Sequence, residues 1–204
     1  MGIDTPERAR DGRPADPFAD KAREALAHFL PVGSSVGLAF DETERDRYGR
    51  TLAFAISSGS VDVQLALLQR GLAATLVVPP RRHAVNCYQR AENAARKGNL
   101  ALWTLSRYRG IEAATLARGA RGFHVLRGTV IRIGHSRTAV WLDLRGNVAL
   151  RVARKDLGHF PHGWSAKTLN GRYVEVRGWV YERKGQRRIT VRHPAALRPV
   201  PRPQ

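Results

Sequence analysis

The chain has 204 residues, with 35 Lys and Arg against 17 Asp and Glu, so its formal net charge is +18. This length allows two small domains with modest cores. Its single cysteine, Cys87, excludes an intrachain disulfide and a cysteine-rich zinc site, and no apolar run reaches the length of a membrane span.

The charge is unevenly distributed along the chain. Residues 115–204 contain 19 Lys and Arg against four Asp and Glu, whereas residues 1–114 contain 16 against 13. This asymmetry favours a polyanion as the partner of the second half. The alternative interpretation is a genome that favours arginine codons, with the charge serving only solubility.

The first stretch with chemical content is Gly2-Ile3-Asp4-Thr5-Pro6-Glu7. The apolar Ile3 and the stiff Pro6 indicate the end of a strand that runs into a rigid loop. Asp4 and Glu7 lie on either side of the proline. One carboxylate can therefore ligate a hard cation while the other faces a water molecule.

Alternating short strands and helices are predicted after this loop. Apolar residues at helical spacing predict a helix that is capped by Asp16 and ends before Pro31. A second helix is predicted between a Ser60 cap and Gly71. The other predicted elements are strands at 35–40 and 51–57, a charged turn at 41–49, a loop at 79–83 and a helix at 84–97.

A second motif, Asp46-Arg47-Tyr48-Gly49-Arg50, precedes the strand at 51–57. Arg50 opens an alternating segment whose apolar set includes Leu52 and Phe54, so its position predicts a side chain at the mouth of a core. Two acids and a guanidinium at such a mouth suit phosphodiester hydrolysis. The attacking water must lose a proton while the phosphoryl oxygens gain charge.

The Asp-Thr-Pro-Glu run, the Asp-x-Tyr-Gly-Arg run and the order of helices after them resemble the thermonuclease family, of which staphylococcal nuclease is the type. The resemblance covers roughly residues 1–103. It implies an α+β nuclease-like domain with an OB-fold, and an endonuclease that uses Ca²⁺ to hydrolyse phosphodiester bonds of DNA or RNA.

The resemblance also assigns roles to individual residues. It implies that Asp4 binds calcium, that Thr5 donates its carbonyl to the metal, and that Asp41 matches a further acid near it. It further implies that Glu7 activates water and that Arg50 contacts the phosphate. Tyr48 is expected to contact nucleic acid.

The chain departs from the family pattern at its start. Family members reach the first motif after three strands, which carry a second calcium-binding aspartate and a second arginine, whereas this chain begins at Met1. We therefore expect an incomplete barrel and little or no activity. Two interpretations stay open: a truncated reading frame, with a periplasmic or secreted protein if the true start lies upstream, or a degenerate copy. Val77 also stands where the family has a base-stacking tyrosine.

The second half predicts a mainly β barrel. Five segments suit strands and a longer insertion follows the third, which is the order of an OB-type barrel. The strands are expected at 123–133, 138–144, 148–152, 173–181 and 187–191, with the insertion at 155–169. The expected domains are a nuclease-like domain at 1–110, a linker at 111–122, a basic OB-like domain at 123–200 and a disordered tail at 201–204.

The fourth of these strands indicates a binding function. Side chains alternate between the two faces of a strand, and the valines of this strand are expected to point inward. The residues between them therefore point outward and place aromatic side chains beside cations. Such a surface binds single-stranded nucleic acid. The outward residues and the adjacent hairpin are Tyr173, Arg177, Trp179, Tyr181, Arg183, Lys184, Arg187 and Arg188. Packing of Trp179 and Tyr181 on other parts of the chain is the alternative, and a non-catalytic nucleic-acid-binding protein is the alternative function.

Overall fold

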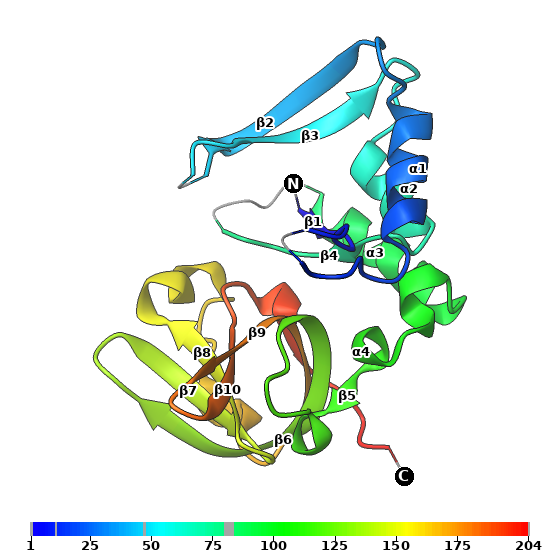
Figure 1. The fold of residues 1–204 in the computed structure, drawn as a ribbon. Coiled ribbons are helices and arrows are strands. Elements are labelled where there is room, and N and C mark those ends of the chain that lie inside the picture. Colours follow the sequence, from blue (N-terminus) through cyan, green and yellow to red (C-terminus); the bar gives the residue numbers. More distant parts are fainter. Residues whose placement is uncertain (1, 11, 47, 80–83, 204) are drawn as a thin grey trace. The chain divides into compact units, whose positions relative to one another are not determined.

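The computed structural model describes residues 2–10, 12–46, 48–79 and 84–203, and the side chains of residues 41–43 lie outside this description. The chain divides into two compact units, Met1–Leu105 and Ser106–Gln204, called unit 1 and unit 2 below (Figure 1). No helix within the described ranges is long and apolar enough to cross a membrane.

The described residues of unit 1 form two separate two-stranded antiparallel sheets (Figure 1). In the first, β1 (Ile3–Asp4) pairs with β4 (Ala74–Thr75). In the second, β2 (Val36–Arg45) pairs with β3 (Thr51–Ser57). β2 is longer than the predicted strand at 35–40, because pairing resumes after a register shift between Phe40 and Arg45. The predicted turn at 41–49 therefore shortens to the residues that follow Arg45.

The helices of unit 1 are α1 (Ala19–Phe29), α2 (Val63–Gln69) and α3 (Val85–Lys97), followed by the 3₁₀ helix η1 (Ala101–Thr104). The predicted helices at these positions are confirmed, but two caps differ. Asp62 rather than Ser60 caps α2, where its Oδ1 accepts a hydrogen bond of 2.9 Å from the Leu65 N–H. The N-cap position of α1 is Phe18, with a positive φ and no side-chain cap, and not Asp16.

The core of unit 1 lies between these helices and one face of β3. Phe54 is buried there beside Tyr88, with ring centroids 6.2 Å apart, and Leu68 is fully buried. On β2, by contrast, Val36, Leu38 and Phe40 remain 45%, 49% and 48% exposed. The paired β2 and β3 thus form an apolar ribbon that the rest of unit 1 covers only in part, which agrees with the incomplete barrel that the sequence predicts.

Unit 2 is a closed barrel of five strands. The hydrogen-bonded order is β6-β7-β8-β10-β9, and β9 pairs again with β6 to close the sheet. β8 and β10 are parallel, and the other neighbours in the barrel are antiparallel. The strands are β6 (Gly122–His135), β7 (Ala139–Leu144), β8 (Val148–Ala153), β9 (Tyr173–Arg183) and β10 (Gln186–Thr190). The predicted OB-type strand order is confirmed.

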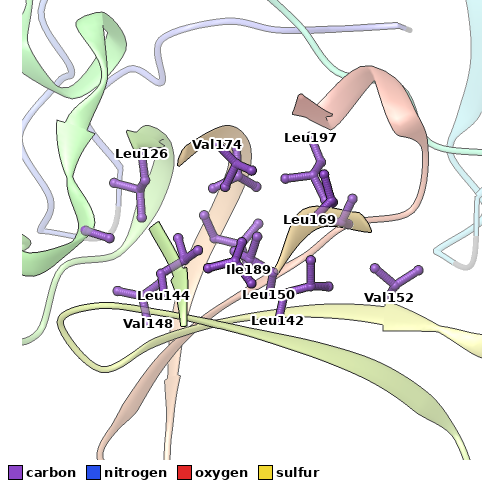
Figure 2. Close-up of a cluster of buried hydrophobic side chains, with 14 of the residues drawn as sticks. Leu126, Leu142, Leu144, Val148, Leu150, Val152, Leu169, Val174, Ile189 and Leu197 are labelled. Carbon is purple, nitrogen blue, oxygen red and sulfur yellow. The ribbon is translucent and has the colours of Figure 1, made fainter. Parts of the chain in front are cut away.

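Alternate residues of every barrel strand point inward and form one apolar core (Figure 2). The sequence between β8 and β9 covers this core with the short helices η3 (Arg154–His159) and η4 (Ala166–Leu169). Inward side chains in Figure 2 include Leu126, Leu142, Leu144, Val148, Leu150, Val174 and Ile189. Leu169 of η4 packs against the same cluster.

The segment before the barrel is not a free linker. It contains α4 (Ser106–Arg109), β5 (Ile111–Glu112) and η2 (Ala113–Thr115), and β5 pairs in parallel with β6. Ala113 and Leu116 are buried in the barrel core. Residues 111–122, expected as a linker, are therefore part of unit 2. At the other end, η5 (Pro194–Ala196) leads into β11 (Leu197–Pro199), which pairs with β9.

Candidate functional site

The first motif is held against α3 through β4. Asp4 pairs with Ala74, and the neighbouring Thr75 donates its backbone N–H to Glu92 Oε2 at 2.6 Å. Glu92 lies on α3 and is almost completely buried. A buried carboxylate that accepts a backbone hydrogen bond fixes β4, the strand with which Asp4 of β1 is paired. The backbone that carries the partly buried Asp4 and Thr5 is therefore held in place.

Glu7 follows the buried Pro6 in a loop that Asp16 closes. The Glu7 N–H donates to Asp16 Oδ2 at 3.1 Å, and the Asp16 N–H donates to the Glu7 carbonyl at 2.8 Å. These reciprocal bonds fix the backbone of Glu7, while its side chain is exposed. The sequence identified Asp16 only as a helix cap, so its role in positioning Glu7 was missed.

The second motif is a turn built around Asp46. Its carboxylate accepts hydrogen bonds from the Tyr48 N–H at 2.8 Å and the Arg50 N–H at 3.0 Å, and Oδ2 lies 2.6 Å from both Nε and Nη2 of Arg50. Desolvation works to raise the pKa of Asp46, but these hydrogen bonds and the guanidinium charge of Arg50 hold the pKa below its ordinary value. Asp46 therefore orients the Arg50 side chain, which is 74% exposed.

The structure places the predicted catalytic residues in two different turns. The backbone N–H of Glu7 is hydrogen-bonded to Asp16, and the side chain of Arg50 is hydrogen-bonded to Asp46. Tyr48 is exposed, and its ring lies 5.4 Å from the Arg50 guanidinium carbon. Arg50 was expected at the mouth of a core, but it precedes β3 and extends into solvent because Asp46 holds it.

The predicted calcium ligands are oxygen donors of the right chemical kind but few in number. Calcium takes six to eight oxygens. Within the described ranges, no group of three or more His, Cys, Asp or Glu side chains could hold a metal ion. Asp4 and Thr5 are adjacent on the first motif, whereas the side chain of Asp41 lies outside the described residues. The described protein oxygens thus supply only part of a calcium shell.

Val77 lines a small apolar pocket in unit 1, beside Phe54 and Tyr88. Tyr88 is buried and donates its hydroxyl to Asp62 Oδ2 at 2.8 Å. Burial and the Asp62 carboxylate raise the pKa of Tyr88, so the hydroxyl stays protonated. This ring is part of the core and not an exposed stacking platform.

Two of the predicted nucleic-acid-binding arginines of unit 2 have structural contacts. The side chain of Arg177 is only 9% exposed and lies 3.7 Å from the buried Glu175. Arg187 donates to the backbone carbonyls of Leu116 and Gly146. Arg177, predicted in the outward row of the strand, is instead buried beside a carboxylate, and Arg187, predicted in the adjacent hairpin, is bonded to backbone carbonyls.

The remaining predicted residues are more accessible. Trp179 is 46% exposed, and Arg183 and Lys184 are exposed near the turn between β9 and β10. Tyr181 and Arg188 are half-buried and directly opposite one another on these two strands. Tyr173, also predicted outward, is buried and bonded through its hydroxyl to Glu112.

The sequence interpretation missed two residues on neighbouring strands. Trp141 of β7 lies directly opposite Arg151 of β8. The guanidinium carbon of Arg188 is 4.8 Å from the Trp141 ring centroid, and that of Arg151 is 6.0 Å away. The alternation within β7 could have revealed Trp141, because Val140 and Leu142 on either side are apolar and point inward.

The elements of unit 1, with a carboxylate loop at residues 4–7 and an Asp–Arg turn at 46–50, define a nuclease-like domain. Residues 1–105 match the family described as Staphylococcal nuclease homologue, and the chain belongs to this family. The thermonuclease resemblance seen in the sequence is thereby confirmed.

Individual relatives match about half of the chain. A thermonuclease of Staphylococcus intermedius is 30% identical over 103 residues, which are 50% of this chain and 60% of that protein. Endonuclease YncB of Bacillus subtilis (strain 168) is 31% identical over 108 residues, or 52% of this chain and 50% of that protein. The SPbeta prophage-derived endonuclease YokF of the same strain is 31% identical over 108 residues, 36% of its length. The chain thus spans at most about 60% of these relatives.

Proposed function

We propose that this protein is a slow, calcium-dependent endonuclease that hydrolyses phosphodiester bonds of DNA or RNA, with its catalytic residues in unit 1. The observation that carries this proposal is the exposed Glu7 on a backbone fixed by Asp16. A general base must be held in place yet remain accessible to water and substrate. Membership of the nuclease family supports the same reaction.

In this proposal Glu7 accepts a proton from the attacking water. Arg50 stabilises the charge that develops on the phosphoryl oxygens. Its Nε and Nη2 atoms already contact Asp46, so phosphate is bound through Nη1 or displaces the Asp46 carboxylate. Asp4 and Thr5 are the residues that would hold calcium, which supplies positive charge next to the phosphate.

We expect the rate to be low. Among the described residues, one arginine is assigned to bind the phosphate, and the oxygens available to bind calcium form an incomplete set. Removal of one preorganised charge contact from an active site costs about 100- to 1,000-fold in rate. A rate at least about 100-fold below that of an intact thermonuclease follows from this estimate.

The proposal is tested by cleavage of labelled DNA and RNA strands with excess calcium or excess chelator. Wild-type protein should cleave slowly with calcium and not with chelator, and Glu7→Gln should lower that rate by about 100- to 10,000-fold. Glu24→Gln is the matched control, because Glu24 is exposed on α1. Equal rates for wild type and Glu7→Gln contradict the proposal.

A non-catalytic nucleic-acid-binding protein is the second candidate. The charge of residues 115–204, with 19 cationic side chains against four acidic ones, favours it. Salt-dependent binding without any calcium-dependent cleavage is the outcome that selects this function.

A further inference from the structure

The outer surface of the barrel in unit 2 carries aromatic and cationic side chains from four neighbouring strands. We call it the Trp141 face and define it as Trp141 (β7), Arg151 (β8), Arg188 (β10) and Tyr181 (β9). Their sequence neighbours Leu142, Leu150, Ile189 and Val180 are buried in the core, so the alternation of each strand directs the four side chains outward.

The strand register makes these residues neighbours. Trp141 pairs with Arg151, and Arg188 pairs with Tyr181. Arg188 links the two pairs, because its guanidinium carbon lies 4.8 Å from the Trp141 ring centroid. The Arg188 Nε–H also donates to Gln186 Oε1 at 3.0 Å, which orients the guanidinium plane. Planar side-chain groups therefore follow one another across four neighbouring strands of the barrel.

We propose that the Trp141 face binds single-stranded nucleic acid, with bases stacked on its rings and guanidinium planes and with phosphates contacting Arg151 and Arg188. Stacking on aromatic side chains requires unpaired bases, because in a duplex both faces of a base are already covered by its neighbours. The exposed Arg183 and Lys184 at the adjacent turn extend the positive charge along the strand path.

The charge around this face supports a polyanionic ligand over an acidic or apolar protein surface. Asp143 is the acidic residue of β7, and Arg132 neutralises it with an N–O distance of 2.6 Å. Arginine suits the site because its planar guanidinium can stack on a base and bind phosphate. All residues of the Trp141 face belong to unit 2, so this inference does not depend on cleavage by unit 1.

The test is fluorescence anisotropy of the full chain with a labelled oligothymidylate of about 15 nucleotides, in excess chelator so that the strand stays intact. Trp141→Leu should weaken binding by about 5- to 150-fold, which corresponds to about 1–3 kcal/mol for one stacked base, without a change in salt dependence. Trp141→Phe keeps a ring and should restore binding to within a few-fold of wild type.

The arginine variants test the phosphate contacts separately. Arg151→Ala and Arg188→Ala should each reduce the slope of log affinity against log salt by about 0.7, the value for one phosphate contact on a single strand. Arg118→Ala, in an exposed turn outside the barrel strands, is the control and should change neither affinity nor slope appreciably. These variants decide the question even if Trp141→Leu fails to fold.

Two results overturn the proposal. The first is that Arg151→Ala and Arg188→Ala both bind the oligonucleotide with the affinity and the salt slope of the wild type. The second is that duplex DNA of the same sequence binds as tightly as the single strand. Absence of cleavage by unit 1 removes the proposed nuclease function but leaves the binding result intact, because binding is measured in chelator and also with Glu7→Gln.

Discussion

Units 1 and 2 both contain strands with alternating apolar residues, but the strands of unit 2 close into a barrel, whereas the described strands of unit 1 form two separate two-stranded sheets. Leu142 and Leu150 of unit 2 are fully buried, whereas Leu38 and Phe40 of unit 1 stay about half exposed. The same alternation thus produces different burial. Burial depends on what covers the apolar face of a strand, and local sequence does not determine that.

The two units also differ in charge. Unit 1 has 14 Lys and Arg against 12 Asp and Glu, while unit 2 has 21 against five. Carboxylates that could act on a water molecule or a metal are therefore mainly in unit 1, and cations that attract phosphate are mainly in unit 2. This division supports hydrolysis in unit 1 and binding in unit 2.

The largest expected stability effect concerns the buried ion cluster of unit 2. Glu175 is 2% exposed and lies 2.9 Å from Arg127, 2.8 Å from Arg198 and 3.7 Å from Arg177. Glu175→Gln leaves Arg177 as a buried charge without its carboxylate, so it should destabilise unit 2 by about 3–5 kcal/mol. Hydrogen exchange of β9 amides measures this loss.

Arg198→Ala, which removes a half-exposed partner, should cost no more than about 1 kcal/mol. Equal losses in both variants contradict this account of the cluster.

A pair of leucine variants tests the difference in burial directly. Leu150→Ala removes a fully buried side chain from the barrel and should cost about 2–5 kcal/mol. Leu38→Ala, on the β2–β3 ribbon of unit 1, should change stability by about 0.5 kcal/mol or less. Scanning calorimetry of both variants measures the shifts. A large destabilisation by Leu38→Ala shows that the ribbon is covered in solution.

The smallest predicted effect is a pH response of the turn around Asp46. The pKa of Asp46 is lower in the folded state than its ordinary value of 3.8. The contribution of Asp46 to the stability of the folded protein is therefore complete above pH 3.8 and is lost as the pH falls through the lowered pKa. Protonation then weakens its contact with Arg50. An NMR titration of the Arg50 Nε–H resonance should show a midpoint below pH 3.8. In Asp46→Asn, this resonance should already have, at neutral pH, the chemical shift that it reaches in the wild type at low pH. A midpoint at or above 3.8 indicates that the contact is absent in solution.

Much of the fold could be predicted from local patterns. Helical spacing located α1, α2 and α3, and alternation with turn residues located the barrel strands and their order. Segments whose structure depends on distant partners were harder. β5 has only two residues and is defined by its pairing with β6, so residues 111–122 resembled a linker. The α2 cap differed because Ser60 and Asp62 are both capable caps, and Asp62 also accepts from Tyr88.

The candidate sites were predictable to a similar degree. Glu7 and Arg50 were identified by their motifs, whereas Asp16 and Asp46, which hold them, act through contacts that the sequence does not specify. In unit 2, parity predicted an outward direction for Arg177 and Trp179 but not that Arg177 packs beside Glu175. Trp141 was missed because the Trp141 face combines single residues from four strands.

The most direct test of the account compares calcium-dependent cleavage and strand binding for wild type and Glu7→Gln. The account predicts that Glu7→Gln loses about 100- to 10,000-fold in cleavage rate while its affinity for the single-stranded oligonucleotide, measured in chelator, stays the same. A wild-type rate no higher than that of Glu7→Gln would contradict the assignment of Glu7 as the general base.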